Sequence, residues 1–135
     1  MRKAPRYLFF LIVLASMSCM RSFAPVDIEE GDMCSNCRMA ISEKRYAAEI
    51  ITADETVLKF DDIGCMLRYQ KTKGPIEAVA IYVADSETKQ WLTAGDAFFV
   101  RSATVKTPMG SGIVAFSSSE NAGAGAVRFA DLPKE

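Results

Sequence analysis

Short apolar segments separated by turn residues are the feature that most constrains the fold of this chain. Residues 47–52, 56–60, 76–84, 97–101 and 113–116 have the length and the residue types of β-strands. Asp54-Glu55 fits a hairpin turn between the first two segments, and Gly74-Pro75 precedes the third. Strands this short must pair and pack against other elements to form a core. The pattern therefore predicts a small sheet protein with helices between some strands.

Two helices are expected between the strands. Asp61 is a candidate N-cap for a helix that continues to about Lys71 and stops before Gly74-Pro75. Ser117 or Ser118 can cap a shorter helix near 119–125. Gly123 and Gly125 weaken that second helix, because an interior glycine costs about 1 kcal/mol relative to alanine. Residues 127–130 are predicted to form a closing strand.

The order strand, strand, helix, strand thus occurs twice, with Phe60-Asp61 and Phe116-Ser117 in equivalent places. This repetition predicts an α+β fold built from two small ββαβ-type modules, at about 40–85 and 90–131, that share one core. A length of 135 residues suits a single domain of this kind.

The N-terminus has the pattern of an export signal. Arg2, Lys3 and Arg6 precede the nine-residue apolar run 7–15. That run is shorter than the roughly 20 residues that a membrane-spanning helix needs. A charged start, a short apolar core and small residues are typical of a secretory signal peptide, assigned here to residues 1–18.

Cys19 follows the small residue Ser18, which favours a bacterial lipoprotein cleavage site with lipid on Cys19. Ser16 stands where such signals carry an aliphatic residue, so cleavage after Ser18 by ordinary signal peptidase is the alternative. Residues 19–31 read as a tether, and residues 32–135 as the folded domain. After processing, 13 basic and 17 acidic residues remain. The net charge of the chain therefore changes from −1 to −4.

The chain contains no histidine. This excludes Ser-His-Asp and Cys-His nucleophile systems and histidine metal pairs, so any metal must be held by sulfur and oxygen. The balance of 16 basic against 17 acidic residues excludes a strongly basic nucleic-acid binder.

Sulfur ligands gather in one segment, Asp32-Met33-Cys34-Ser35-Asn36-Cys37-Arg38-Met39. Thiolates and thioethers are soft donors that suit Cu(I), and Asp32 can hydrogen-bond to the loop or lend a carboxylate oxygen. The same spacing fits a redox pair, a structural disulfide or part of a zinc site. A zinc site would need a second pair of ligands, and the sequence does not supply a complete one. In thioredoxin-like proteins a strand precedes the motif, and none is expected here.

Two further sulfur residues lie outside that segment. Cys65 falls on the apolar face of the first predicted helix, where a core role is favoured over a ligand role. Met109 lies in a Pro-Met-Gly-Ser-Gly loop, from which its thioether could project toward the cysteines.

Taken together, these pieces resemble the NosL family, accessory lipoproteins of nitrous oxide reductase maturation. The resemblance rests on the Asp32-x-Cys34-x-x-Cys37-x-Met39 loop, the stretch Phe60-Asp61-Asp62-Ile63-Gly64-Cys65-Met66, Trp91 with Ala94 and Ala97, and Thr107-Pro108-Met109-Gly110. These motifs span about residues 30–118 in the family's order.

The resemblance implies a non-enzymatic Cu(I) metallochaperone with two ββαβ modules, as in alkylmercury lyases. It implies copper ligands among Cys34, Cys37, Met39 and Met109, with Asp32 in support. It further implies a periplasm-facing lipoprotein that works with nitrous oxide reductase, as its copper client, and an ABC-type maturation complex. The alternatives are a thiol–disulfide redox protein, or a structural lipoprotein module with a Cys34–Cys37 disulfide. Organomercurial cleavage is a weaker enzymatic alternative that rests on the shared fold.

Overall fold

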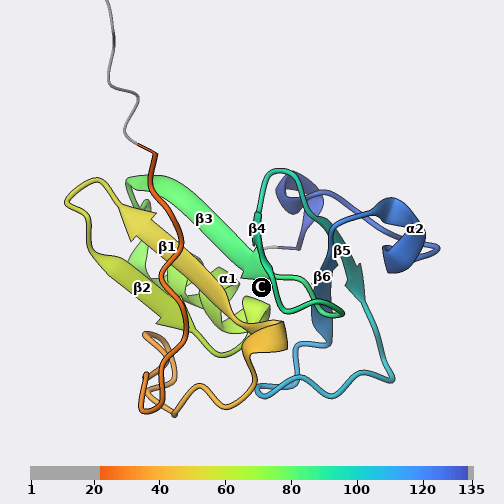
Figure 1. Cartoon of the computed structure of the whole chain (residues 1–135), viewed down its shortest axis with the longest axis horizontal. Coiled ribbons are helices and arrows are strands. Elements are labelled where there is room, and N and C mark those ends of the chain that lie inside the picture. The colour runs from red at the N-terminus through yellow and green to blue at the C-terminus, as the bar shows by residue number, and fades with distance from the viewer. Residues whose placement is uncertain (1–21, 134–135) are drawn as a thin grey trace, which may run out of the picture.

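The computed structural model describes residues 22–133 (Figure 1). Four strands form an antiparallel sheet in the order β2-β1-β3-β4, and two more, β5 and β6, form a second antiparallel sheet. The strands are β1 (Ala48–Thr52), β2 (Val57–Phe60), β3 (Ala78–Ala84), β4 (Trp91–Thr93), β5 (Phe98–Arg101) and β6 (Ile113–Phe116); the helices are α1 (Ile63–Lys73), α2 (Ser119–Ala122) and the 3-10 turns η1 (Lys44–Tyr46) and η2 (Phe129–Asp131). The predicted mixed α+β class is confirmed.

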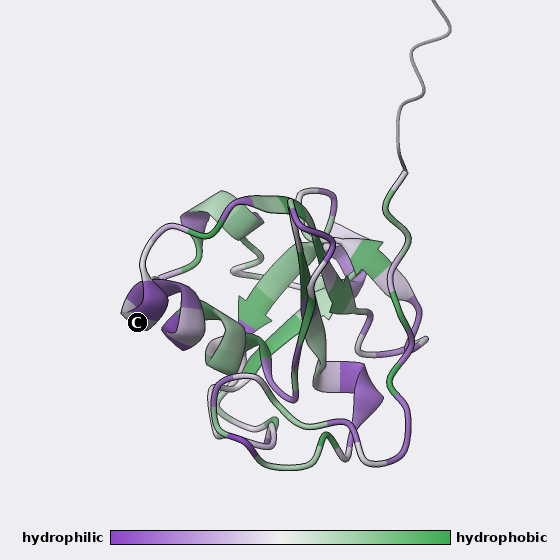
Figure 2. Ribbon diagram, turned by 90° about the vertical axis from the view of Figure 1, so that its left-hand side faces the viewer, coloured by the Kyte–Doolittle hydropathy of each residue, from purple (hydrophilic) through white to green (hydrophobic). Residues whose placement is uncertain are grey.

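Strand β1 is one of the two inner strands of the larger sheet and is covered on both faces. It pairs with β2 through Ala48↔Phe60 and with β3 through Ala48↔Val83. In Figure 1 helix α1 lies behind the sheet and the N-terminal segment crosses in front of it. The first four residues of β1 are therefore all buried, and Figure 2 shows hydrophobic strands at the centre of the molecule.

Helix α1 begins one residue later than the sequence indicated. Asp62 is the N-cap, and its carboxylate accepts a hydrogen bond from Gly64 N at 2.6 Å. The expectation that Asp61 caps this helix is wrong, because Asp61 turns inward from the end of β2 and is 2% exposed. The helix ends at Lys73, since Gly74 adopts a positive φ of 80° and Pro75 follows it.

The second half of the chain repeats the first in reduced form. Strands β5 and β6 pair through Phe98↔Phe116, and Ser118 caps the short helix α2 through Asn121 N. The expected strand 127–130 is reduced to a single bridge between Val127 and Phe99, followed by η2. Strand β4, which has no counterpart among the predicted strands, lies within the range of the second module but pairs with β3.

One hydrophobic core joins the two halves. It includes Phe60 and Val83 from the first half and Phe99 and Ile113 from the second. The buried carboxylate of Asp85 fixes the junction, because it accepts a hydrogen bond from Ser117 N at 2.9 Å. The two predicted modules thus share a core.

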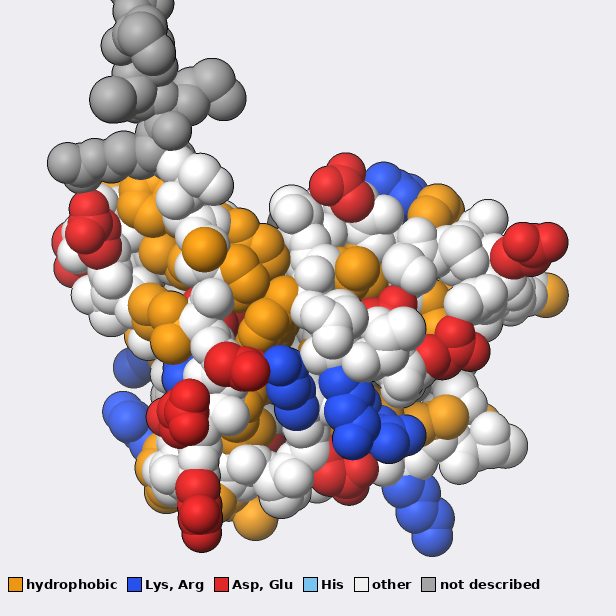
Figure 3. Space-filling view, viewed as in Figure 1, with side chains coloured by type: hydrophobic (Ala, Val, Ile, Leu, Met, Phe, Trp, Pro, Cys, Tyr) orange, Lys and Arg blue, Asp and Glu red, His pale blue; other side chains and the backbone are white. Residues whose placement is uncertain are grey.

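The residues before the cysteines form a segment that we call the N-terminal strap (residues 23–32). Its Val26 N donates to both carboxylate oxygens of Glu49, a fully buried residue of β1, at 3.1 and 3.2 Å. The Tyr82 hydroxyl donates to Phe23 O, and Lys44 forms an ion pair with Asp27. In Figure 3 acidic side chains lie along the lower part of this segment, next to basic ones.

Between residues 22 and 133 no helix has the length and apolar character needed to cross a membrane. The proposed signal peptide (1–18) and the candidate lipid site Cys19 lie outside the described residues.

Candidate metal site

The cysteine loop (residues 33–40) is a tight turn held against β2. Cys34 N donates to Met39 O at 2.8 Å, and Arg38 N donates back to Cys34 O at 3.0 Å. Arg38 reverses the chain with a positive φ of 64°. Ser35 N also donates to Lys59 O at 2.8 Å, which fixes the loop to the strand that leads to Asp61. The turn therefore has a defined position relative to the rest of the site.

Two more functional groups come from the junction of β2 and α1. Asp61 follows the last residue of β2, and Cys65 lies in the first turn of α1. The carboxylate of Asp62 fixes this junction by capping the helix. Gly64 is required here, because a side-chain Cβ in its place would overlap Ser111 Cβ in the loop that approaches the helix.

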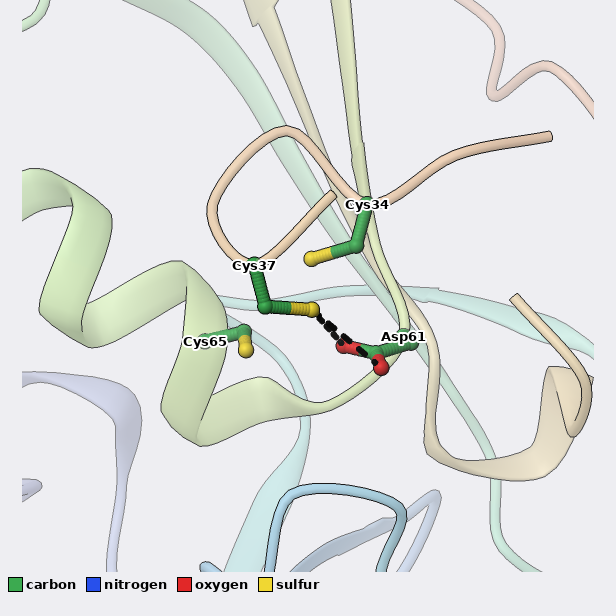
Figure 4. Close-up of side chains that lie close together, drawn as sticks. All are labelled: Cys34, Cys37, Asp61 and Cys65. Atoms are coloured by element: carbon green, nitrogen blue, oxygen red, sulfur yellow. Dashed lines mark hydrogen bonds between the residues drawn. The ribbon is translucent and has the colours of Figure 1, made fainter. Parts of the chain in front are cut away.

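The loop and the junction bring Cys34, Cys37, Asp61 and Cys65 together (Figure 4). Each offers one ligand atom, and these atoms all lie within 4.8 Å of one another. Cys34 and Cys65 are fully buried, whereas Cys37 is half-buried. The group therefore opens to solvent on the Cys37 side.

Hydrogen bonds orient the members of the cluster. The Cys37 thiol points to the Asp61 carboxylate, with sulfur–oxygen distances of 3.7 and 3.8 Å (Figure 4). The Cys65 sulfur accepts from Asn36 Nδ2 at 3.6 Å and from the Arg68 guanidinium at 3.5 Å. Each of these donors or acceptors belongs to the loop, to the junction or to α1, so the cluster is built from both segments.

The cluster also sets the protonation of its thiols. The hydrogen bond from the Cys65 thiol lowers the pKa of Cys34 to about 4, and backbone N–H groups of Cys37, Asp61 and Asn36 act in the same direction. The neighbouring Cys34 sulfur raises the pKa of Cys65, and burial raises the pKa of Cys37. Burial, with the Cys34 sulfur beside it, raises the pKa of Asp61 to about 6. The hydrogen bonds thus favour negative charge on the Cys34 sulfur over the other two sulfurs of the cluster.

Three sulfurs and one carboxylate around a single point form a soft metal site. Thiolates select Cu(I) and Zn²⁺ over hard cations such as Mg²⁺ or Ca²⁺. Metal binding would displace the protons of Cys37 and Cys65, and the Asp61 carboxylate already faces the Cys37 thiol.

The candidate ligands predicted from the sequence comprise two cysteines, one aspartate and two methionines, and the structure places each kind differently. Cys34 and Cys37 are members of the cluster. Asp32 lies outside it: Lys59 Nζ binds its carboxylate at 2.6 Å and lowers the pKa of Asp32. Met39 is 57% exposed on the rim of the cysteine loop. Met109 is half-buried against the core, and its N–H donates to the Asp62 carboxylate at 3.2 Å, which places its backbone beside the site.

Asp61 and Cys65 are the two cluster members outside the set of ligands predicted from the sequence. Asp61 was interpreted as a helix cap and Cys65 as core. A signal for Asp61 does exist in the sequence, since Asp61-Asp62 offers two acids where a cap needs one. Cys65 belongs to the stretch 60–66 that carries the family resemblance, but a core role was favoured for it because burial of a cysteine on a helix is common.

Comparisons with known proteins agree with this fold. The NosL family model matches residues 25–131. The solved crystal structure of the copper chaperone NosL from Shewanella denitrificans superimposes with a TM-score of 0.72 at 21% sequence identity, covering 81% of this chain and 95% of that one. No curated protein sequence matches significantly. Because the family model spans most of the chain, including every residue of the cluster, this protein belongs to the NosL family.

Proposed function

We propose that this protein is an exported Cu(I) metallochaperone that holds copper at the cluster of Cys34, Cys37, Asp61 and Cys65 and passes it to a copper enzyme. The observation that carries the proposal is the convergence of three thiol sulfurs and a carboxylate within 4.8 Å. The NosL family match and the likeness to a protein described as a copper chaperone support a carrier rather than an enzyme.

Copper(I) fits this donor set better than zinc on two grounds. The donors are mainly sulfur, and Cu(I) is stable with two or three soft ligands. Asp61 can then remain outside the coordination shell and act as the acceptor for the Cys37 proton. Zinc would use all four groups as a closed tetrahedral site, which suits a structural role more than delivery.

Delivery is proposed to proceed from the Cys37 side of the cluster. Cys37 is the half-buried sulfur, and the exposed thioethers of Met33 and Met39 flank it in the cysteine loop. A sulfur ligand of a partner can enter there before Cys37 leaves, so the ion exchanges without being released into solution. Met39 and Met109, predicted as ligands from the family resemblance, would assist this exchange.

The cellular setting belongs to the same proposal. The signal-like residues 1–18 and Cys19 support export and a lipid anchor on the periplasmic side of a membrane. The family resemblance supports nitrous oxide reductase as the client and an ABC-type complex as a partner in its maturation. Identifying which copper enzyme loses its copper when the gene is deleted tests this part.

The binding proposal is tested by titrating the reduced full chain, in detergent, with Cu(I) against a competing chelator. We expect one tightly bound Cu(I) per chain, lost in Cys34→Ser and Cys37→Ser. Met33→Leu is the matched control, since it removes an exposed sulfur outside the cluster. A parallel titration with Zn²⁺ separates the two metals. Equal Cu(I) binding by the wild type and both cysteine variants would overturn the proposal.

A redox role is less well supported by the geometry. Cys34 has the lowered pKa of an attacking thiolate, but its side chain is fully buried. Redox pairs need an accessible nucleophile. Turnover of a disulfide substrate by the reduced chain, at rates lost in Cys34→Ser, would favour the redox alternative instead.

A further inference from the structure

Lys59 connects three segments next to the metal cluster. It lies on β2, two residues before Asp61, and its side chain is only 14% exposed. Its Nζ donates to Asp27 O at 2.6 Å and to the Asp32 carboxylate at 2.6 Å. One ammonium group therefore binds the N-terminal strap at two points, one of them directly before the cysteine loop.

Asp32 transmits this contact to the cysteine loop. Its carboxylate also accepts from Glu29 N at 2.8 Å, and its backbone oxygen accepts from Ile41 N at 2.9 Å. This last bond closes the base of the loop, next to the bridge between Met33 and Ala40. The position of Asp32 thus fixes both ends of the loop that carries two of the thiols.

The backbone of Lys59 also binds the cysteine loop directly. Its carbonyl accepts from Ser35 N at 2.8 Å. Opposite Lys59 in the sheet register is Glu49, which receives the strap through Val26 N. In Figure 1 the strap runs down the front of β1 to the loop at the lower end of the sheet. Strap, loop and cluster are therefore linked through one residue.

We propose that Lys59 is a positioning residue for the metal site, which clamps Asp32 and Asp27 so that docking of the N-terminal strap sets the geometry of the cysteine loop. This inference rests on the proposed function for its metal readout. Asp32 then serves the site through Lys59 rather than as a ligand. Coupling of this kind is reciprocal: copper in the cluster stabilises the docked strap to the same extent that the strap stabilises bound copper.

The first test needs no metal. In the reduced, metal-free full chain we measure the rate at which iodoacetamide modifies Cys34, which is buried when the loop is in place. We expect Lys59→Met and Asp32→Asn each to raise the rate of Cys34 modification about fivefold or more. A fivefold change is the lower end of the range that couplings between sites usually produce. Lys59→Arg should restore most of the protection. Lys71→Met, at an exposed position on α1, is the control.

Combining the substitutions separates a clamp from a ligand. If Lys59 and Asp32 act as one unit, Lys59→Met with Asp32→Asn changes the Cys34 rate and the Cu(I) affinity no more than either substitution alone. We expect each single variant to bind Cu(I) about five- to tenfold more weakly. Additive losses would instead mean that Asp32 contributes independently, as a ligand would, and would overturn the inference.

Because the coupling is reciprocal, the effect of Cu(I) on the strap can also be measured. A substitution that only destabilised the fold would not abolish this effect of the metal. Cu(I) loading should slow hydrogen exchange of the Val26 amide in the wild type, and this effect should be lost in Lys59→Met. Unchanged Cys34 modification in both Lys59→Met and Asp32→Asn refutes the clamp whatever the metal results. A wild type that binds no Cu(I) refutes the proposed function, while the modification rates still decide the role of Lys59.

Discussion

The N-terminal ends of α1 and α2 are built on one plan, yet the metal cluster forms only at α1. Each follows an aromatic residue that ends a strand, Phe60 or Phe116, and each is capped by the second residue after it, Asp62 or Ser118. The residue between strand and cap differs. Asp61 is buried and faces the thiols, whereas Ser117 is exposed and its N–H binds Asp85.

The two helices also differ in length and burial, and again α1 is the more firmly fixed of the two. Helix α1 has eleven residues, and its first five are buried, so its first turn is a rigid part of the core. Helix α2 has four residues and ends at Ala122, with Gly123 as its C-cap. A shared strand–turn–helix frame thus becomes a candidate metal site only where the helix is long enough to fix its first turn and a second segment, the cysteine loop, covers it.

Removing the sulfur at the third position of α1 should have the largest effect. Cys65→Ser deletes a buried cluster member, and we expect Cu(I) affinity to fall by at least about 100-fold, beyond the 10- to 100-fold cost of losing a supporting partner. The equivalent position in α2 is Asn121, so Asn121→Ser is the control and should leave affinity unchanged. Competition titration with a Cu(I) chelator measures both. Comparable affinities in the two variants would mean that Cys65 is only a core residue.

Gly64→Ala should give the next largest effect, this time on stability. The added methyl group would overlap Ser111 Cβ and push the 107–112 loop away from α1. We expect a loss of about 1–3 kcal/mol in the free energy of unfolding, as for other overpacked sites. Glu120→Ala, at the same position of the exposed α2, should change it by less than about 0.5 kcal/mol. Urea unfolding followed by circular dichroism compares them, and equal stabilities would contradict the close approach.

Much of this frame could be predicted from the sequence because it depends on local chemistry. Strands such as 113–116, and a serine cap at Ser117 or Ser118, follow from residue type and turn signals alone. Strand β4 was missed because Trp91–Thr93 is three residues long and forms only by pairing with β3. The strand predicted at 127–130 is only a bridge at Val127, because the chain turns into η2 from Phe129 onward.

The site was predictable only in part, because local patterns do not reveal long-range contacts. Cys34 and Cys37 could be identified from their spacing. Asp61 and Cys65 join them only because β2 and α1 meet under the loop, which is a long-range packing event. The sequence offered Asp32 either as a hydrogen-bonding partner of the loop or as a carboxylate ligand, and in the structure Lys59, 27 residues away, binds its carboxylate. Local patterns therefore do not indicate the contacts of residues whose partners are distant in the sequence.

Replacing the residue between strand and cap tests the comparison directly. Asp61→Asn keeps the size of the side chain but cannot accept the Cys37 proton as a carboxylate does. We expect Cu(I) affinity at pH 7 to fall about tenfold, while Ser117→Ala has no effect. Since the pKa of Asp61 is raised to about 6, the wild type loses the carboxylate as the pH falls from 7 to 5. The difference between wild type and Asp61→Asn should therefore shrink over that range. A constant difference would exclude the carboxylate as the proton acceptor.

The two caps should show the smallest contrast. Ser118→Ala removes one hydrogen bond, to Asn121 N, from a short and mostly exposed helix, and should cost about 0.5 kcal/mol. Asp62→Ala removes two, because Asp62 accepts from Gly64 N inside the helix and from Met109 N in the facing loop. Both Asp62 bonds lie in or next to buried structure, so we expect a cost of about 2 kcal/mol in urea unfolding. Similar costs at the two caps would show that the Met109 loop is not held by Asp62. A larger cost at Asp62, with faster hydrogen exchange at Met109, would place that loop and its thioether under the control of the same junction that presents Asp61 and Cys65.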